Sequence, residues 1–128
     1  MNYVSDTHAL VWYFTGDKRL SKKAFRAFEE TIKEGLVIIP AMVLAEVMYI
    51  SNKGRVSISF KETLKMIKEY DNFEIAPLDV DILEIADSID SKMEMHDRLI
   101  IATTIYFDAI LITKDMQIKE SGIVQTIW

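Results

Sequence analysis

Short, fully apolar runs alternate with amphipathic segments along this chain, and this alternation limits the fold more than any other feature. Residues 36–39 contain only Leu, Val and Ile, which is typical of a strand that a parallel sheet buries on both faces. In the intervening segments apolar residues recur at helical spacing, as do Ala24, Phe25, Phe28 and Ile32. The alternation predicts an α/β protein, a three-layer α/β/α sandwich with a parallel sheet of about five strands.

Local signals mark the ends of these segments. Gly16 and Gly35 follow two helical segments, Pro40 suits the first turn of a third, and Ser59 with Glu62 forms a capping box for a fourth. The predicted strands are residues 2–5, 36–39, 73–76, 109–113 and 124–128. The predicted helices are residues 7–14, 21–35 and 40–52, one beginning at Ser59, one beginning at Asp79 or Asp81, and 97–106.

The composition is that of an ordinary globular domain, with 128 residues, of which 50% are hydrophobic and 27% are charged. We expect one domain spanning residues 1–128. The absence of cysteine excludes disulfides and thiol catalysis and is compatible with a cytoplasmic location. We expect no membrane span, because the longest apolar run is short and contains Pro40 and Glu46. The net charge of −5 argues against a general nucleic-acid coat protein, but not against a nuclease whose acids hold divalent ions.

Glu46 is the charged residue that is hardest to explain as a structural residue, because it is the only one between Leu36 and Asn52. Burying a carboxylate costs several kcal/mol unless a cationic group compensates it. No Lys or Arg lies within helical reach, so the partner must come from elsewhere, either a metal ion shared with other acids or a distant lysine. Its helical neighbours, three and four positions away, are Met42, Val43, Tyr49 and Ile50.

Three further acids stand where strands and helices of such a fold meet. Asp6 ends the first strand, Asp97 begins the helix before the fourth strand, and Asp115 follows the fourth strand. Glu46 lies about two turns into the helix after the second strand. Because the carboxyl ends of parallel strands form one edge, where α/β proteins bind ligands, all four acids can meet there.

Four carboxylates form a hard-oxygen ligand set that suits Mg²⁺ or Mn²⁺. Two such ions about 3.5–4 Å apart would clamp the attacking and leaving oxygens of a phosphodiester and would activate a water as the nucleophile. The hydroxyls of Thr7 and Thr113 could orient the carboxylates from outside the metal's ligands, although either could instead cap the local backbone.

Each of these residues also has a structural explanation. Taken alone, Asp6 and Asp97 are more often helix N-caps than catalytic groups, and Asp115 could be a turn residue. His8 and His96 lie beside candidate ligands, but a surface or packing role is the more common one for such histidines.

Together these motifs resemble the PIN-domain nucleases, especially the VapC-like toxins of toxin–antitoxin pairs, over nearly the whole chain. The opening VSDTHALVWYF resembles the family's first strand and places its first acid on Asp6. The segment IPAMVLAEVMYISNKGRVSIS places the second acid on Glu46. The stretch MHDRLIIATTIYFDAILITKD is the most specific and places the third and fourth acids on Asp97 and Asp115.

The resemblance implies a Mg²⁺- or Mn²⁺-dependent endoribonuclease that cleaves RNA, forms a homodimer and is inhibited by a small antitoxin protein. Such a partner could insert Arg or Lys among the carboxylates. Lys53 and Arg55 are candidate substrate contacts, although basic clusters of this kind more often form solvated helix faces. The apolar residues that could complete an antitoxin contact are Met48, Tyr49, Ile50 and Phe60. They could instead form a homodimer interface or the core, and for any one of them the core is the more common place.

Other functions are compatible with parts of this pattern. A housekeeping ribonuclease or a DNA-directed nuclease could use the same four acids, and a catalytically silent binding module could share the fold. A receiver-type signalling domain would need adjacent acids after the first strand, where Asp6 stands alone. A haloacid-dehalogenase-type phosphatase would need a second Asp two residues later, where the chain has His8.

Overall fold

Five short strands form one parallel sheet in the computed structural model, which describes residues 1–128. Neighbouring strands follow the order β3-β2-β1-β4-β5, and every pair is parallel. The strands are β1 (Tyr3–Ser5), β2 (Val37–Pro40), β3 (Phe73–Ala76), β4 (Ile110–Ile112) and β5 (Thr126–Ile127).

Strand β1 lies at the centre of the sheet, where Val4 pairs with Ile38 of β2 on one side and Leu111 of β4 on the other. These three side chains are at most 2% exposed. The central strands are apolar on both faces because helices cover both faces, as expected for a parallel sheet.

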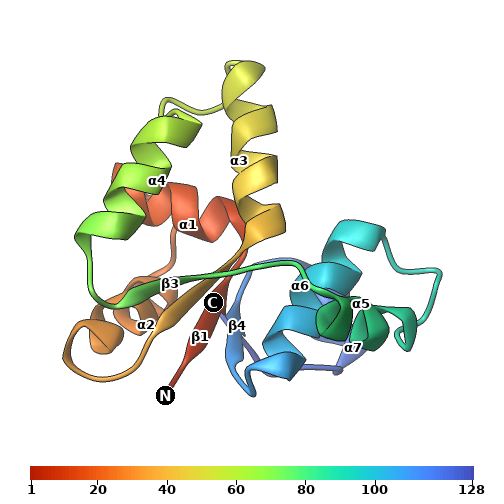
Figure 1. Ribbon diagram of the computed structural model, residues 1–128. Coiled ribbons are helices and arrows are strands. Elements are labelled where there is room, and N and C mark those ends of the chain that lie inside the picture. Colours follow the sequence, from red (N-terminus) through yellow and green to blue (C-terminus); the bar gives the residue numbers. More distant parts are fainter.

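Seven helices complete the fold, with α1 to α4 on one side of the sheet and α5 to α7 on the other (Figure 1). This arrangement confirms the predicted three-layer α/β/α sandwich. None of the helices combines the length and hydrophobicity that crossing a lipid bilayer requires. They are α1 (Thr7–Thr15), α2 (Lys22–Lys33), α3 (Ala41–Asn52), α4 (Phe60–Glu69), α5 (Val80–Asp87), α6 (Met95–Tyr106) and α7 (Met116–Ser121).

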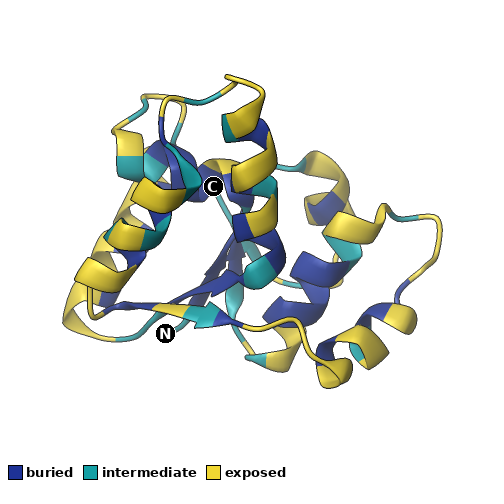
Figure 2. Ribbon diagram, turned by 45° about the horizontal axis from the view of Figure 1, so that its top comes forward, coloured by how far each residue is buried: buried dark blue, intermediate teal, exposed yellow.

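The core lies between the sheet and the inward faces of the helices, as the burial colouring in Figure 2 shows. In α2, however, Phe25 and Ile32 are 47% and 56% exposed, so the apolar face predicted for this helix is partly wrong. The buried row instead contains Phe28 and Thr31, and Phe28 stacks on Tyr13 with ring centroids 4.2 Å apart. Thr31 satisfies its hydroxyl group by donating to the carbonyl of Phe28, which allows its burial.

Two helix boundaries differ from the prediction in ways that affect the acids. Helix α6 begins at Met95 with Glu94 as N-cap, so the prediction that Asp97 begins this helix is wrong. No capping side chain or proline marks Glu94, and the sequence therefore carries no start signal there. Helix α7 was not predicted, because its six residues are too few to show a periodic pattern. Asp115 is the N-cap of this helix and not a plain turn residue.

Candidate active site

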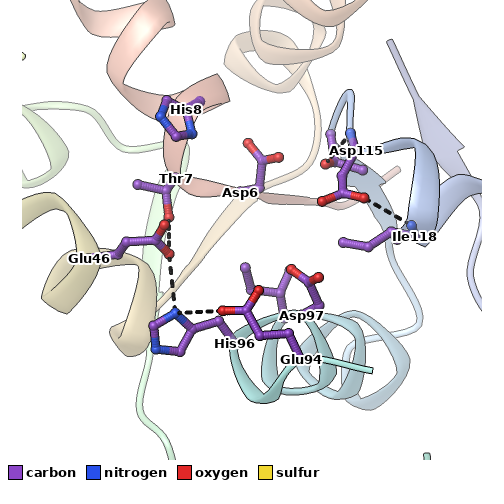
Figure 3. A pocket seen from close by; sticks show the side chains of 11 residues that line it. Asp6, Thr7, His8, Glu46, Glu94, His96, Asp97, Asp115 and Ile118 are labelled. Atoms are coloured by element: carbon purple, nitrogen blue, oxygen red, sulfur yellow. Dashed lines mark hydrogen bonds and ion pairs between the residues drawn. The ribbon is translucent and has the colours of Figure 1, made fainter. Parts of the chain in front are cut away.

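A pocket of about 210 Å³ opens at the carboxyl edge of the sheet and is lined by all four predicted acids. Asp6 follows β1, Asp115 follows β4, and helices α3 and α6 bring Glu46 and Asp97. Figure 3 shows the four side chains around one open space, with Glu46 on one side and Asp115 opposite. Segments far apart in sequence therefore contribute acids to a single pocket.

Asp6 is both a pocket residue and the N-cap of α1. Its carboxylate accepts a hydrogen bond of 2.9 Å from the backbone N–H of Ala9. Burial raises the pKa of Asp6 above its ordinary value, and hydrogen bonds from the Thr113 side chain and the Ala9 backbone partly oppose this. Asp6 is thus a carboxylate whose charge has lost part of its solvation, a situation that a nearby cation would relieve.

Glu46 lies in the middle of α3 and is half-buried. Its Oε1 accepts a hydrogen bond of 2.9 Å from the hydroxyl of Thr7 and lies 3.9 Å from Nδ1 of His96. The partner that the sequence required from elsewhere in the chain is therefore a buried hydroxyl and an imidazole, and no lysine or arginine forms an ion pair with Glu46.

Asp97 occupies the first turn of α6 and has the most informative electrostatics in the pocket. Its pKa is raised to about 6 by burial, and then by the negative charges of Asp115, Glu94 and Glu46, while His96 lowers it. These carboxylates are therefore close enough for their negative charges to repel one another.

Asp115 is held by the backbone around it. Its carboxylate accepts from the N–H groups of Gln117 and Ile118 at 2.9 and 3.1 Å. The hydroxyl of Thr113 accepts from the N–H of Asp115 at 3.1 Å. Thr113 thus contacts the backbone of one pocket acid and the side chain of another, Asp6.

The two basic residues predicted to contact substrate do not line this pocket. Arg55 lines a neighbouring groove, and the ammonium group of Lys53 lies 5.6 Å from the centre of the Tyr49 ring. Both side chains are exposed.

Three polar residues of the pocket were not predicted as site residues, namely Glu94, His8 and His96. His96 Nδ1 lies 3.8 Å from Glu94 Oε1, so it bridges two carboxylates (Figure 3). The available signal was the run MEMHD, in which Glu94 precedes Asp97 by three residues and so shares its side of the helix.

The donor chemistry of the pocket fits a hard divalent cation. Carboxylate and hydroxyl oxygens dominate it, there is no sulfur, and the acids destabilise one another's charges. In this arrangement no three Asp, Glu or His side chains are placed to hold one ion together. Mg²⁺ is commonly bound by one or two carboxylates with several waters and substrate phosphates, so it does not require a complete protein cage.

The chain belongs to the PIN domain family, whose pattern matches residues 3–123. This confirms the resemblance that the segments around Asp6, Glu46, Asp97 and Asp115 indicated from the sequence. A comparison with curated proteins gives no match.

Three solved structures share this fold over almost the whole length of both chains. VapBC2 from Rickettsia felis, solved with a promoter DNA fragment, is 17% identical with a TM-score of 0.72 over 99% of this chain and 98% of that one. VapC20 from Mycobacterium tuberculosis, described as a toxin that cleaves the sarcin-ricin loop, is 16% identical with a TM-score of 0.70 over 98% of each chain. A toxin–antitoxin complex from Klebsiella pneumoniae is 22% identical with a TM-score of 0.69, over 98% of this chain and 96% of that one.

Proposed function

We propose that this chain is a Mg²⁺- or Mn²⁺-dependent endoribonuclease and the toxin of a toxin–antitoxin pair. The observation that carries the proposal is that Asp6, Glu46, Asp97 and Asp115 line one pocket. Burial there, and then the neighbouring negative charges, raise the pKa of Asp97. A fold gains no stability from such repulsion, so the cluster is best explained by a cationic ligand. Membership of the PIN domain family supports the nuclease, and the described activity of VapC20 favours RNA as the substrate.

Each residue has a distinct role in this proposal. Asp6, Glu46, Asp97 and Asp115 would hold the ions, with Thr7 orienting Glu46 and Thr113 orienting Asp6 and the Asp115 backbone. When bound, the divalent ions would lower the pKa of a water and neutralise charge on the phosphate. The half-buried position of the acids keeps them accessible to a phosphodiester while limiting their hydration.

An inhibitory partner fits the surface next to the pocket. The solved relatives from Rickettsia felis and Klebsiella pneumoniae are complexes of toxin with antitoxin. Met48 and Tyr49 of α3 are 43% and 55% exposed and could contribute to such an interface. Ile50 is 6% exposed and packs in the core, which the sequence favoured for any single one of these candidates, so Ile50 is not part of the proposed interface. Homodimer formation stays a prediction.

The proposal is tested by comparing substrates under one set of conditions. Purified protein is incubated with single-stranded RNA, folded RNA and DNA, each with Mg²⁺, with Mn²⁺ and with excess chelator. We expect metal-dependent cleavage of RNA and products that carry 5′-phosphate ends. Cleavage of DNA but not RNA would show that the substrate is DNA. Binding of either nucleic acid without cleavage would indicate a catalytically silent binding module. Products with 2′,3′-cyclic phosphate ends would overturn hydrolysis by water.

A further inference from the structure

Two grooves adjoin the carboxylate pocket, and both contain basic side chains. The first, which we call the arginine groove, has a volume of about 320 Å³, contains Arg19, Arg55 and Tyr49, and shares Glu46 and His96 with the carboxylate pocket. The second, the lysine groove, has a volume of about 270 Å³ and contains Lys23, Lys114 and Lys119. It reaches the carboxylate pocket at Thr113. An acidic pocket is thus continued on two sides by basic grooves.

Most of the positive charge in these grooves has no internal partner. In the ion pairs of the structure the basic partner is either Arg19 or His96. Arg55, Lys114 and Lys119 therefore make no salt bridge, and all three are exposed. Unpaired cations that border a hollow beside a phosphodiester-cleaving site are placed to contact phosphates.

The Trp12 ring contacts one basic side chain from each groove. The ring lies 4.7 Å from the guanidinium of Arg19 and 4.8 Å from the ammonium of Lys114, and it contacts Trp128 at 5.9 Å. These cation–π contacts help to hold Arg19 and Lys114 in place. Because Trp12 is only 4% exposed, it offers no free face to a base. Arg19 is further fixed by Asp17, which accepts from it at 3.0 and 2.7 Å.

Tyr49 has the opposite character. Its side chain is 55% exposed, on the helix that carries Glu46, and Lys53 lies near one of its faces. An exposed aromatic ring in a basic groove is a platform on which an unpaired base can stack.

We infer that the two grooves hold one single-stranded RNA on both sides of the phosphate that is cleaved. Arg55 contacts backbone phosphate and Tyr49 stacks on a base on one side, and Lys114 and Lys119 contact backbone phosphates on the other. This inference rests on the proposed function, and it adds the substrate's form, a strand that is unpaired at the cut and continues past it in both directions.

Equilibrium binding in the absence of cleavage tests the inference. Fluorescence anisotropy with a labelled single-stranded RNA is measured in chelator, on an Asp97→Asn background. Arg55→Glu is compared with the double variant Lys114→Glu/Lys119→Glu. The control is Lys61→Glu/Lys65→Glu on α4, which makes the same charge change at two exposed residues that line neither groove.

We expect both groove variants to raise Kd by about tenfold or more at low salt and to flatten its salt dependence, with the control within about twofold of its parent. Tyr49→Ala should raise Kd by about fivefold or more, while Tyr49→Phe should not, because stacking requires the ring alone.

If the RNA occupies both grooves, the same assay should also respond to shortening the RNA from each end. Shortening the RNA from one end should remove the sensitivity to Arg55→Glu, and shortening it from the other end should remove the sensitivity to the double lysine variant. Groove variants that bind like the control, or one truncation that removes both sensitivities, would overturn the inference. The proposed function is judged separately, by whether the unmodified protein cleaves RNA with Mg²⁺.

Discussion

The hydroxyl of Thr7 donates a hydrogen bond of 2.9 Å to Oε1 of Glu46, joining the first turn of α1 to the middle of α3. Thr7 is buried, whereas Glu46 is half-buried and faces the pocket. The bond therefore fixes the orientation of a carboxylate that would otherwise rotate among several positions. This contact links the packing of two helices directly to the geometry of the candidate site.

Thr7→Val should lower nuclease activity more than it lowers stability. Val keeps the shape of the side chain but removes the donor, and loss of such an orienting partner typically costs about 10- to 100-fold in activity or metal affinity. The free energy of unfolding should fall by only about 1 kcal/mol, because water can reach Glu46. Thr7→Ser retains the hydroxyl and should retain most of the activity. Equal activity in the Val and Ser variants would exclude the orienting role.

Replacing Asp6 in two ways separates its capping role from its role in the site. Asp6→Asn keeps an oxygen that can accept from the Ala9 N–H, whereas Asp6→Ala loses the cap, at a cost of about 0.5–2 kcal/mol. We expect activity to fall by about 100-fold or more in both variants. Denaturant unfolding should show a large loss of stability only in Asp6→Ala. If Asp6→Asn retains activity, Asp6 acts only as a helix cap and has no role in catalysis.

The pKa of Asp97 predicts how the stability of the metal-free protein depends on pH. Because its pKa is about 6 in the folded protein and 3.8 is its ordinary value, the folded state binds this proton more tightly than the unfolded state. The contribution of Asp97 to stability is therefore fully present below about pH 4 and is lost as the pH rises through about 6. Asp97→Asn should melt higher than the unmodified protein at pH 7.5 in chelator, and the difference should shrink towards pH 4.5.

One control variant and the addition of Mg²⁺ bear on the interpretation of this pH effect. Glu74→Gln removes an exposed carboxylate on β3, away from the pocket, and should not reproduce the pH-dependent difference. Adding Mg²⁺ should reduce the advantage of Asp97→Asn, because a bound cation offsets the same repulsion. A difference in melting temperature that does not vary with pH would contradict the proposed repulsion among the acids.

Gly35 should be essential for the fold. Its φ of +107° is unfavourable for other residues, and a Cβ built there would lie 2.1 Å from the backbone oxygen of Met1. Gly35→Ala should lower the free energy of unfolding by about 2 kcal/mol or more, because both strain and a clash with backbone are added. Gly54→Ala is the matched control, with φ of +69° and open space around the Cβ position, and should cost about 1 kcal/mol. If both variants lower the free energy of unfolding equally, the clash with the Met1 backbone does not contribute.

The layers of the fold and the convergence of the acids could be predicted from the sequence for a simple physical reason. Strands such as Val37–Pro40 are buried on both faces, so their continuous apolar runs indicate a sheet that helices cover on both sides. Because the carboxyl ends of parallel strands lie at one edge, the residues that follow those strands meet there. The same logic placed Asp6 and Asp115 after β1 and β4. Glu46 was detectable because a lone charge in an apolar helix requires a partner.

What could not be predicted depended on contacts between distant segments. The burial of Thr31 in place of Ile32 depends on which face of α2 packs on Tyr13 of α1, which Phe28 does. The spacing of apolar residues in α2 was compatible with more than one buried face. Glu94 lines the pocket because it is the N-cap of α6. Its spacing of three residues from Asp97 becomes informative only once the start of α6 is known, and no capping residue marks that start. The position of Arg19 over Trp12 likewise depends on the loop between α1 and α2, which carries no periodic pattern.

The metal dependence of RNA cleavage by the unmodified protein tests the central claim most directly. Cleavage of a labelled single-stranded RNA is followed during a titration with Mg²⁺, then in excess chelator, and again after Mg²⁺ is restored. We predict activity that rises with Mg²⁺, stops in chelator and returns on restoration, and that is lost by about 100-fold or more in Asp97→Asn under the same conditions. Cleavage that continues unchanged in chelator, or that Asp97→Asn leaves intact, would contradict the claim that these carboxylates act through a divalent cation.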